Sequence, residues 1–263
     1  MRLKDKIALV TAATRGIGAC IAREFAREGA IVYIGARRMD AAEKMADELN
    51  AKGLNVHAVY NDAEKHETYQ SMIDTVVSEQ GRIDVLVNNF GGSNPKIDKD
   101  ICSTKYEDFI NVVDKTLASV FLASQSAIPH MSKGGSIINI SSLSGSHPDV
   151  SQIGYGTSKA AVNYMTKLIA THTARKNIRC NAVAPGMTAT DAVKNNLTDD
   201  FQDFFLRHTP IRRMASPEEI AHACTYFASD ESAFVTGQLL EVAGGFGMPT
   251  PVFADTLDAG VSR

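Results

Sequence analysis

Residues 6–18, KIALVTAATRGIG, decide the fold of this chain. An apolar run of strand length, residues 6–11, leads directly into a turn that contains Gly16 and Gly18, and a helical pattern begins at Ile17. Glycine at these positions removes Cβ atoms where the backbone turns tightly, and it lets a pyrophosphate approach the N-terminus of the helix. A strand, a glycine turn and a helix in this order predict the first unit of a dinucleotide-binding domain. We expect the cofactor contacts of this turn to come from Thr14, Arg15, Gly16, Ile17 and Gly18.

Strand-like and helix-like segments alternate along the rest of the chain. Short apolar runs predict strands at 6–11, 30–35, 55–60, 83–88, 135–141, 177–186 and 237–245. Segments of helical length lie between or after them at 17–29, 40–53, 64–81, 154–176 and 217–229. Gly53 and Gly81 are placed to end two of these helices. The alternation predicts an α/β fold, a parallel sheet with helices on both faces, in a single domain over residues 1–263.

The composition excludes several classes of partner. A net charge of −3 gives no electrostatic reason to expect nucleic acid or another polyanion. No apolar run approaches the ~20 residues that span a bilayer, and we interpret the apolar stretch near the N-terminus as a strand and not a signal peptide. No two cysteines have C-x-x-C spacing, which favours free thiols in a reducing compartment such as the cytoplasm. The histidines form no closely spaced pair, so the sequence indicates no metal site.

The end of the second predicted strand bears on the choice of dinucleotide. In NAD-binding proteins an acidic residue near this point accepts hydrogen bonds from the adenosine ribose. Here residues 32–38 read VYIGARR, with Ala36 in place of the acid, followed by Arg37 and Arg38. Together with Arg15 of the glycine turn, these arginines suit a 2′-phosphate, which favours NADP over NAD. A solvated basic corner is the alternative interpretation.

Other polar residues follow the third and fourth predicted strands, at the edge where open α/β sheets bind ligands. Asp62 is placed to contact the adenine amino group, or alternatively to cap the next helix. The NNFGG run at 88–92 offers Asn89 and Gly91 to the cofactor, whereas Asn88 has an alternative structural use between strands.

Tyr155 and Lys159 are four residues apart in a predicted helix, so both side chains lie on one helix face. A free phenol has a pKa near ~10, and a nearby ammonium favours its ionised form, which makes the phenol a better acid–base catalyst near neutral pH. Ser142 lies thirteen residues earlier and offers a hydroxyl to hold a substrate oxygen beside Tyr155. Ser141 and Ser144 remain alternatives. A serine nucleophile is disfavoured because no G-x-S-x-G motif encloses Ser142.

These motifs together resemble the short-chain dehydrogenase/reductase family. The match rests on TAATRGIG, NNFGG, the serine thirteen residues before YGTSK, and NAVAPG, and it covers residues 5–245. The resemblance implies a doubly wound, seven-stranded parallel sheet and reversible hydride transfer between a nicotinamide and a carbinol carbon. It also implies that Tyr155 is the acid–base, that Lys159 lowers its pKa and holds the nicotinamide ribose, and that Ser142 orients the substrate. The further cofactor contacts that it implies are at Pro185, Gly186, Thr188 and Thr190.

One position departs from the family pattern. The helix after the fourth strand usually carries an asparagine that supports a water chain from the lysine to solvent, and here the aligned residue is Thr116, in KTLASVF. A threonine hydroxyl is shorter and has a single donor, so the departure bears on the proton relay more than on hydride transfer.

Two segments are candidates for the substrate site. Residues 187–215 contain Phe201, Phe204 and Phe205 and are predicted to form a lid, and residues 247–263 form an apolar tail near the active site. A dimer contact is the alternative use of both segments.

Several further runs, among them GSHPDVSQIGYGTSK and EVAGGFGMPTPVFA, resemble the bacterial NADP-dependent hydroxysteroid dehydrogenases that act at the 7α position of bile acids. The alternatives are the 12α or 3 position of the steroid, reduction of 3-oxoacyl thioesters, and a sensor that binds NADP without turnover. Family members are commonly dimers or tetramers, and we favour a homotetramer.

Overall fold

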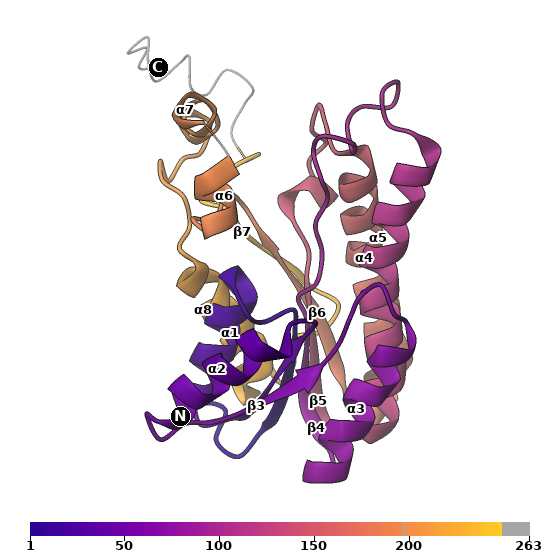
Figure 1. Ribbon diagram of the computed structural model, residues 1–263, viewed down its shortest axis with the longest axis vertical. Helices are drawn as coiled ribbons and strands as arrows, with labels where there is room; N and C mark the ends of the chain where they lie inside the picture. The colour runs from indigo at the N-terminus through magenta and orange to yellow at the C-terminus, as the bar shows by residue number, and fades with distance from the viewer. Residues whose placement is uncertain (197, 249–263) are drawn as a thin grey trace.

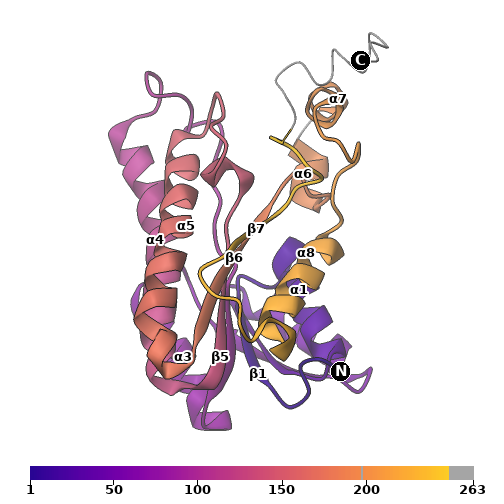
Figure 2. The same ribbon diagram turned by 180° about the vertical axis from the view of Figure 1, so that it is seen from behind.

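Seven parallel strands form one sheet, in the order β3-β2-β1-β4-β5-β6-β7 (Figures 1 and 2). The computed structural model describes residues 1–196 and 198–248. The strands are β1 Ile7–Thr11, β2 Ile31–Ala36, β3 Asn55–Tyr60, β4 Ile83–Asn88, β5 Met131–Ile140, β6 Arg179–Pro185 and β7 Leu239–Val242. The chain order reverses at β1, which pairs with β2 on one side and with β4 on the other. The predicted doubly wound sheet is confirmed, and ligands bind such sheets at the carboxyl ends of the strands beside this reversal.

Helices cover both faces of the sheet (Figure 1). One face carries α1 Gly16–Arg27, α2 Met39–Asn50 and α8 Pro217–Ala228, and the other carries α3 Glu67–Gln80, α4 Tyr106–Ala127 and α5 Ile153–Thr173. Because successive residues of a strand point to opposite faces, neighbours in one strand serve different cores. Val10 belongs to the buried cluster under α1 and α8, and the adjacent Leu9 belongs to the cluster under α3 and α4.

Helix ends follow the sequence only in part. Gly81 ends α3 in the left-handed conformation, with φ of 76°, as its position predicts. Gly53 also has a positive φ, but it lies in the turn beyond α2, which ends at Asn50. In the described part of the chain, no helix is long and apolar enough to cross a bilayer.

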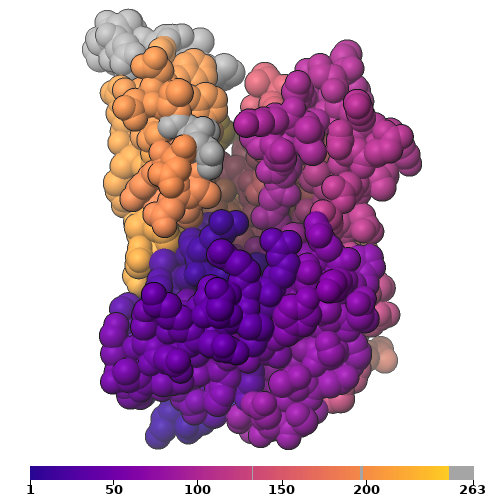
Figure 3. Space-filling view, in the orientation of Figure 1, coloured from indigo at the N-terminus to yellow at the C-terminus, as the bar shows by residue number. Residues whose placement is uncertain are grey.

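Residues 187–215, predicted as a lid, contain two short helices that the sequence patterns did not reveal. These are α6 Asp191–Asn196 and α7 Asp199–Arg207, and Thr198 caps α7 by accepting a hydrogen bond from the N–H of Phe201. The segment stands above the carboxyl ends of the strands, and a cleft separates it from the magenta segment before α4 (Figure 3). Of the predicted tail 247–263, only Gly247 and Met248 fall within the described residues.

Candidate active site

The glycine turn is closely packed against two other loops at the carboxyl ends of the strands. A Cβ atom on Gly18 would overlap the side-chain amide of Asn89 and would lie 2.8 Å from the carbonyl oxygen of Ala12. Gly16 has a φ of 55°, and a Cβ atom there would lie 3.5 Å from the Thr190 methyl group. The first helix therefore starts in a cradle that only glycine permits, which fits the pyrophosphate of a dinucleotide.

Asn89 ties the end of β4 to the end of β1. Its amide donates to the carbonyl oxygens of Thr11 and Ala12, both at 3.1 Å, and its backbone N–H donates to the Thr11 hydroxyl at 3.0 Å. These bonds fix the two loops that were predicted to hold the cofactor. The sequence analysis missed Thr11, although a threonine at the last position of a buried strand is the available signal.

Asn88 has the structural use that the sequence left open. Its amide donates to the side-chain oxygen of Asn139 in β5 at 2.8 Å and to the Ser124 hydroxyl in α4 at 3.1 Å. Asn139 in turn donates to the Thr166 hydroxyl in α5 at 2.8 Å. A buried polar chain, which we call the asparagine ladder (Ser124, Asn88, Asn139 and Thr166), thus joins α4 and α5 through the sheet.

Asp62 is buried in the turn after β3. One carboxylate oxygen accepts the N–H of Glu64 at 3.1 Å, so the side chain closes this turn rather than capping α3, which begins at Glu67. The turn also holds Asp62 through Thr68, whose hydroxyl accepts from the Asp62 N–H and donates to its carbonyl oxygen, both at 3.0 Å. Adenine contact stays a prediction for this residue.

The three predicted phosphate-binding arginines are all exposed. Arg15 is the N-cap residue of α1, and Arg37 and Arg38 lie between β2 and α2. None of the three guanidinium groups forms an ion pair with another described residue. Ala36 is buried, so no acid occupies the end of β2.

The loop after β6 carries the other predicted cofactor contacts. Pro185 ends β6, and Gly186 packs so closely on Ala243 that a Cβ atom would lie 2.9 Å from the Ala243 Cα. Thr188 is buried and donates to the Gly186 carbonyl oxygen at 3.0 Å. Thr190, in contact with the glycine turn, therefore closes the cradle from the opposite side.

Ser142, Tyr155 and Lys159 come together where β5 and α5 meet. The side chain of Ser142 lies near the Tyr155 phenol and favours its ionised form. The ammonium of Lys159 lies 5.6 Å from the centroid of the Tyr155 ring and donates to the carbonyl oxygen of Ile140, the last residue of β5, at 2.7 Å. A Cβ atom on Gly91 would lie 2.5 Å from this ammonium, so glycine at this position makes room for the lysine.

Burial controls the ionisation of this pair in the protein itself. Burial raises the pKa of Tyr155, and the hydrogen bond to Ser142 opposes that rise. Burial also lowers the pKa of Lys159 to about 8. The expected depression of the Tyr155 pKa is therefore not what the protein alone shows, because removal of the phenol from water is the larger effect.

The alternative serines have other partners. Ser141 is buried, and its hydroxyl donates to the side-chain oxygen of Asn163 in α5. Ser144 uses its backbone N–H to donate to the Ser142 hydroxyl at 3.2 Å. Ser142 is thus the serine whose hydroxyl meets Tyr155.

Comparisons with known proteins agree with this geometry. A family model described as enoyl-(acyl carrier protein) reductase matches residues 11–247. The chain is 46% identical to a 7alpha-hydroxysteroid dehydrogenase of Clostridium sardiniense over 97% of this chain and 98% of that protein. It is 38% identical to a 3-oxoacyl-(acyl carrier protein) reductase of Staphylococcus epidermidis over 93% of this chain and 100% of that protein. A solved 7 alpha-hydroxysteroid dehydrogenase, complexed with NADH and 7-oxo glycochenodeoxycholic acid, superposes with a TM-score of 0.88 at 35% identity, covering 93% of this chain and 95% of that one.

The chain belongs to the short-chain dehydrogenase/reductase family. As a member it is an oxidoreductase whose cofactor is a nicotinamide dinucleotide. Glycine at positions 16 and 18 permits the positive φ and the close contact with Asn89 that shape this turn, and such a turn at a helix N-terminus suits the pyrophosphate of that cofactor. In the described part of the chain, no three His, Cys, Asp or Glu side chains are grouped so as to hold a metal ion.

Thr116, the departure from the usual pattern of short-chain dehydrogenases, lies on α4, and its side chain and that of Lys159 both lie close to Gly91. Its side chain is fully buried, and its hydroxyl has no hydrogen-bond partner among the described residues. The methyl group lies 3.9 Å from the Cβ position of Gly91, which itself touches Lys159. The neighbouring Asn111 is exposed, so it does not replace the usual asparagine. A role of Thr116 in proton relay stays a prediction.

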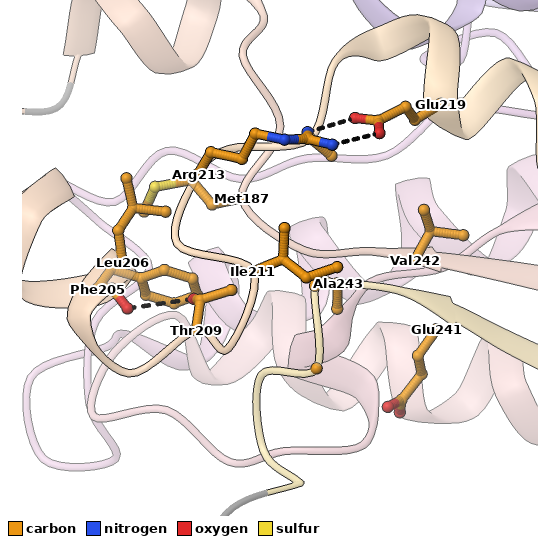
Figure 4. Close-up of a pocket in the computed structure, with 13 residues that line it drawn as sticks. Met187, Phe205, Leu206, Thr209, Ile211, Arg213, Glu219, Glu241, Val242 and Ala243 are labelled. Atoms are coloured by element: carbon orange, nitrogen blue, oxygen red, sulfur yellow. Dashed lines mark hydrogen bonds and ion pairs between the residues drawn. The ribbon is translucent and has the colours of Figure 1, made fainter. Parts of the chain in front are cut away.

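A cavity of about 300 Å³ lies between the lid and the end of β7 (Figure 4). Its apolar walls include Met187, Phe205, Leu206, Ile211 and Val242, and the guanidinium of Arg213 extends to Glu219 in a two-bond pair at 2.7 and 2.8 Å. Ser142, Tyr155 and Lys159 do not line it. The cavity is therefore formed by the lid and the end of β7 and does not include these three residues.

Proposed function

We propose that this protein oxidises the 7α-hydroxyl group of bile acids to the ketone, and catalyses the reverse reduction, with NADP(H). One observation carries the proposal: Ser142, Tyr155 and Lys159 converge at the sheet edge in a chain that matches a 7alpha-hydroxysteroid dehydrogenase along 97% of its length.

Tyr155, Ser142 and Lys159 have separate roles in the reaction at the substrate oxygen. A bound nicotinamide supplies hydride transfer to and from the carbinol carbon. The Tyr155 oxygen accepts the hydroxyl proton during oxidation and returns it to the ketone oxygen during reduction. Ser142, whose side chain lies near the Tyr155 phenol, holds the same substrate oxygen in reach. Protonated Lys159 stabilises the phenolate electrostatically and is held in place by Ile140.

The preference for NADP over NAD is supported by charge. Arg15 at the start of α1 and Arg37 and Arg38 after β2 are exposed, and none of them forms an ion pair within the described residues, although Arg37 is close enough to Glu64 to help lower the pKa of that carboxyl. A guanidinium that need not break an ion pair is available for the 2′-phosphate, where charge-assisted hydrogen bonds are strong. The buried Ala36 offers no carboxylate to a ribose hydroxyl.

Replacement of both Arg37 and Arg38 by serine tests this preference. We expect kcat/KM for NADP⁺ to fall by at least about 100-fold, and kcat/KM for NAD⁺ to stay unchanged, because each of the two charged hydrogen bonds contributes about 1.5–3 kcal/mol. Arg175→Ala is the matched control, since Arg175 is exposed in the turn before β6, at the opposite end of the strands. Equal loss with both cofactors would contradict the proposed role of these arginines.

The lid is suited to an apolar substrate. Phe205 stacks on Phe246, which follows β7, with ring centroids 4.4 Å apart and an angle of 4° between the rings. Phe201 and Phe204 of α7 remain about half exposed, at 48% and 59%. Exposed aromatic rings beside an apolar cavity fit a large, rigid hydrocarbon skeleton such as a steroid.

Product identification is the decisive experiment for the substrate. The enzyme is incubated with cholate and NADP⁺, and the product is separated and its ketone position determined. We expect the 7-oxo product, with formation lost in Tyr155→Phe. A 12-oxo or 3-oxo product would show another regiochemistry, and no turnover across a bile-acid panel would refute the proposal.

A second candidate is reduction of 3-oxoacyl thioesters, which the 38% identity to a 3-oxoacyl-(acyl carrier protein) reductase favours. It predicts NADPH oxidation with an acetoacetyl thioester and none with a 7-oxo bile acid. The third alternative is a sensor that binds NADP tightly but turns over neither substrate, and the unusual Thr116 is the feature that favours it.

Assembly as a homotetramer and residence in the cytoplasm are further proposals. All four cysteines are free thiols, as expected in a reducing compartment.

A further inference from the structure

Asp98 lies outside every motif discussed so far, yet its side chain contacts the backbone of the catalytic tyrosine. The residue is fully buried, in the loop between β4 and α4. One carboxylate oxygen accepts the N–H of Gly154 at 2.8 Å, and the other accepts the N–H of Tyr155 at 3.0 Å. A buried carboxylate thus binds the first turn of α5 by two charge-assisted hydrogen bonds.

The first turn of α5 depends on this loop because the helix has no cap of its own. Gln152, the N-cap residue, is left-handed, with φ of 60°, and its side chain caps no N–H group; it donates instead to the Ser93 hydroxyl at 2.7 Å. The N–H of Ile153 donates to the carbonyl oxygen of Lys99 at 2.9 Å. The N–H groups at 153, 154 and 155 are therefore all satisfied by residues 98–99.

Gly154 allows this contact. A Cβ atom at this position would lie 3.2 Å from the Asp98 carboxylate and 3.2 Å from the Cβ of Val112 in α4. Both distances are tighter than ordinary contacts, so a side chain would push the start of α5 away from Asp98 and from α4. Gly154, directly before the proposed catalytic tyrosine, thus allows the Asp98 carboxylate to reach the backbone of α5.

We propose that Asp98 is a positioning residue, which fixes the start of α5 so that the Tyr155 hydroxyl meets Ser142 and the substrate oxygen. The same loop begins at the cofactor-binding residues Asn89 and Gly91, so Asp98 also couples the cofactor edge of β4 to the catalytic helix. This inference rests on the proposed acid–base role of Tyr155 and not on the choice of steroid position.

The first test separates positioning from stability. In Asp98→Asn one oxygen is retained, but an NH₂ group faces the N–H of Tyr155, so one hydrogen bond is lost and two donors meet. We expect kcat with cholate and NADP⁺ to fall by about 10- to 100-fold while KM for NADP⁺ stays unchanged, since misplacement of a reacting group by about 1 Å is this costly. Asp98→Ala should be at least as slow.

Ser216→Ala is the matched control. Ser216 caps α8 by accepting from the N–H of Glu219 at 3.3 Å, so its replacement also removes a helix cap, but far from Tyr155 along the chain. Its kcat should stay unchanged although its melting temperature falls. If Asp98→Asn lowers the melting temperature as Ser216→Ala does and leaves kcat intact, the proposal is overturned.

A double-mutant cycle with Ser142→Ala distinguishes positioning of Tyr155 by Asp98 from a purely structural role of Asp98. If Asp98 acts by holding Tyr155 against Ser142, then Asp98→Asn should slow the Ser142→Ala enzyme much less than it slows the wild type. Additive effects on kcat would contradict positioning. Should the wild type oxidise no bile acid, the proposed substrate fails, and the same cycle is measured with acetoacetyl thioester reduction.

Discussion

Helix α5 and helix α7 face the same site but are held in different ways. Helix α5 is fixed by buried polar groups, among them Asp98 at its first turn and Asn139 further along. Helix α7 contains no buried residue and is held by its Thr198 cap and by the stacking of Phe205 on Phe246. From this comparison we expect the directional hydrogen bonds of α5 to position the reacting groups, and the aromatic surface of α7 to bind the substrate with room to adjust.

Tyr155→Phe sharpens this comparison most strongly. The substitution removes the proton carrier from α5 and leaves α7 untouched, so we expect kcat to fall by about 10²- to 10⁴-fold with little change in bile-acid affinity. Steady-state kinetics gives kcat, and equilibrium binding of the bile acid to the NADP-loaded enzyme gives the affinity. A large loss of bile-acid affinity would mean that α5, and not α7, selects the substrate.

Lys159→Met tests whether the buried ammonium of Lys159 in α5 lowers the stability of the folded protein. The pKa of Lys159 in the folded protein is about 8, below its ordinary value of 10.5. Below pH 8 the buried lysine is charged, and this lowers the free energy of unfolding. The destabilisation disappears as the pH rises from 8 toward 10.5, because the lysine then loses its proton in both states. The pKa difference corresponds to about 3 kcal/mol, and loss of the bond to Ile140 offsets part of it.

We therefore expect Lys159→Met to be more stable than the wild type by about 1–2 kcal/mol at pH 7, with kcat strongly reduced. The gain should vanish near pH 10, and chemical denaturation of the cofactor-free proteins at both pH values measures it. A gain that is independent of pH would instead indicate better packing by methionine.

Phe205→Ala probes the other side of the comparison. Loss of the stacked pair should raise KM for the bile acid by about 3- to 10-fold, because such a pair contributes about 0.5–1.5 kcal/mol, and should leave kcat nearly unchanged. Phe234→Ala is the control, since Phe234 is fully exposed and lies outside the lid, between Ser232 and β7. A selective loss of kcat would show that the lid also orients the reacting atoms.

Sequence reasoning was strongest where one residue type has one physical use. The glycine turn and the strand–helix alternation predicted the sheet and its helices, because backbone geometry and apolar periodicity are local properties. Tyr155 and Lys159 were paired correctly for the same reason: their spacing in one helix determines their shared face.

Long-range contacts were beyond such reasoning. Asp98 meets α5 across 56 residues of chain, and no local pattern distinguishes it from the acids near it in sequence. The effect of burial on Tyr155 depends on how completely the surrounding loops exclude water, which spacing alone does not encode. The lid helices α6 and α7 were missed because they have only six and nine residues, too few for a periodic pattern to be distinguished from a loop.

The asparagine ladder has a consequence for the motions of the protein. Because Asn139 is bonded both to Asn88 and to Thr166, the middle of α5 cannot separate from the sheet without also releasing the contact between Asn88 and α4. The amide protons in the centres of α4 and α5 should consequently exchange with solvent at one common, slow rate, as a single cooperative unit, while those of α7 exchange by brief local openings.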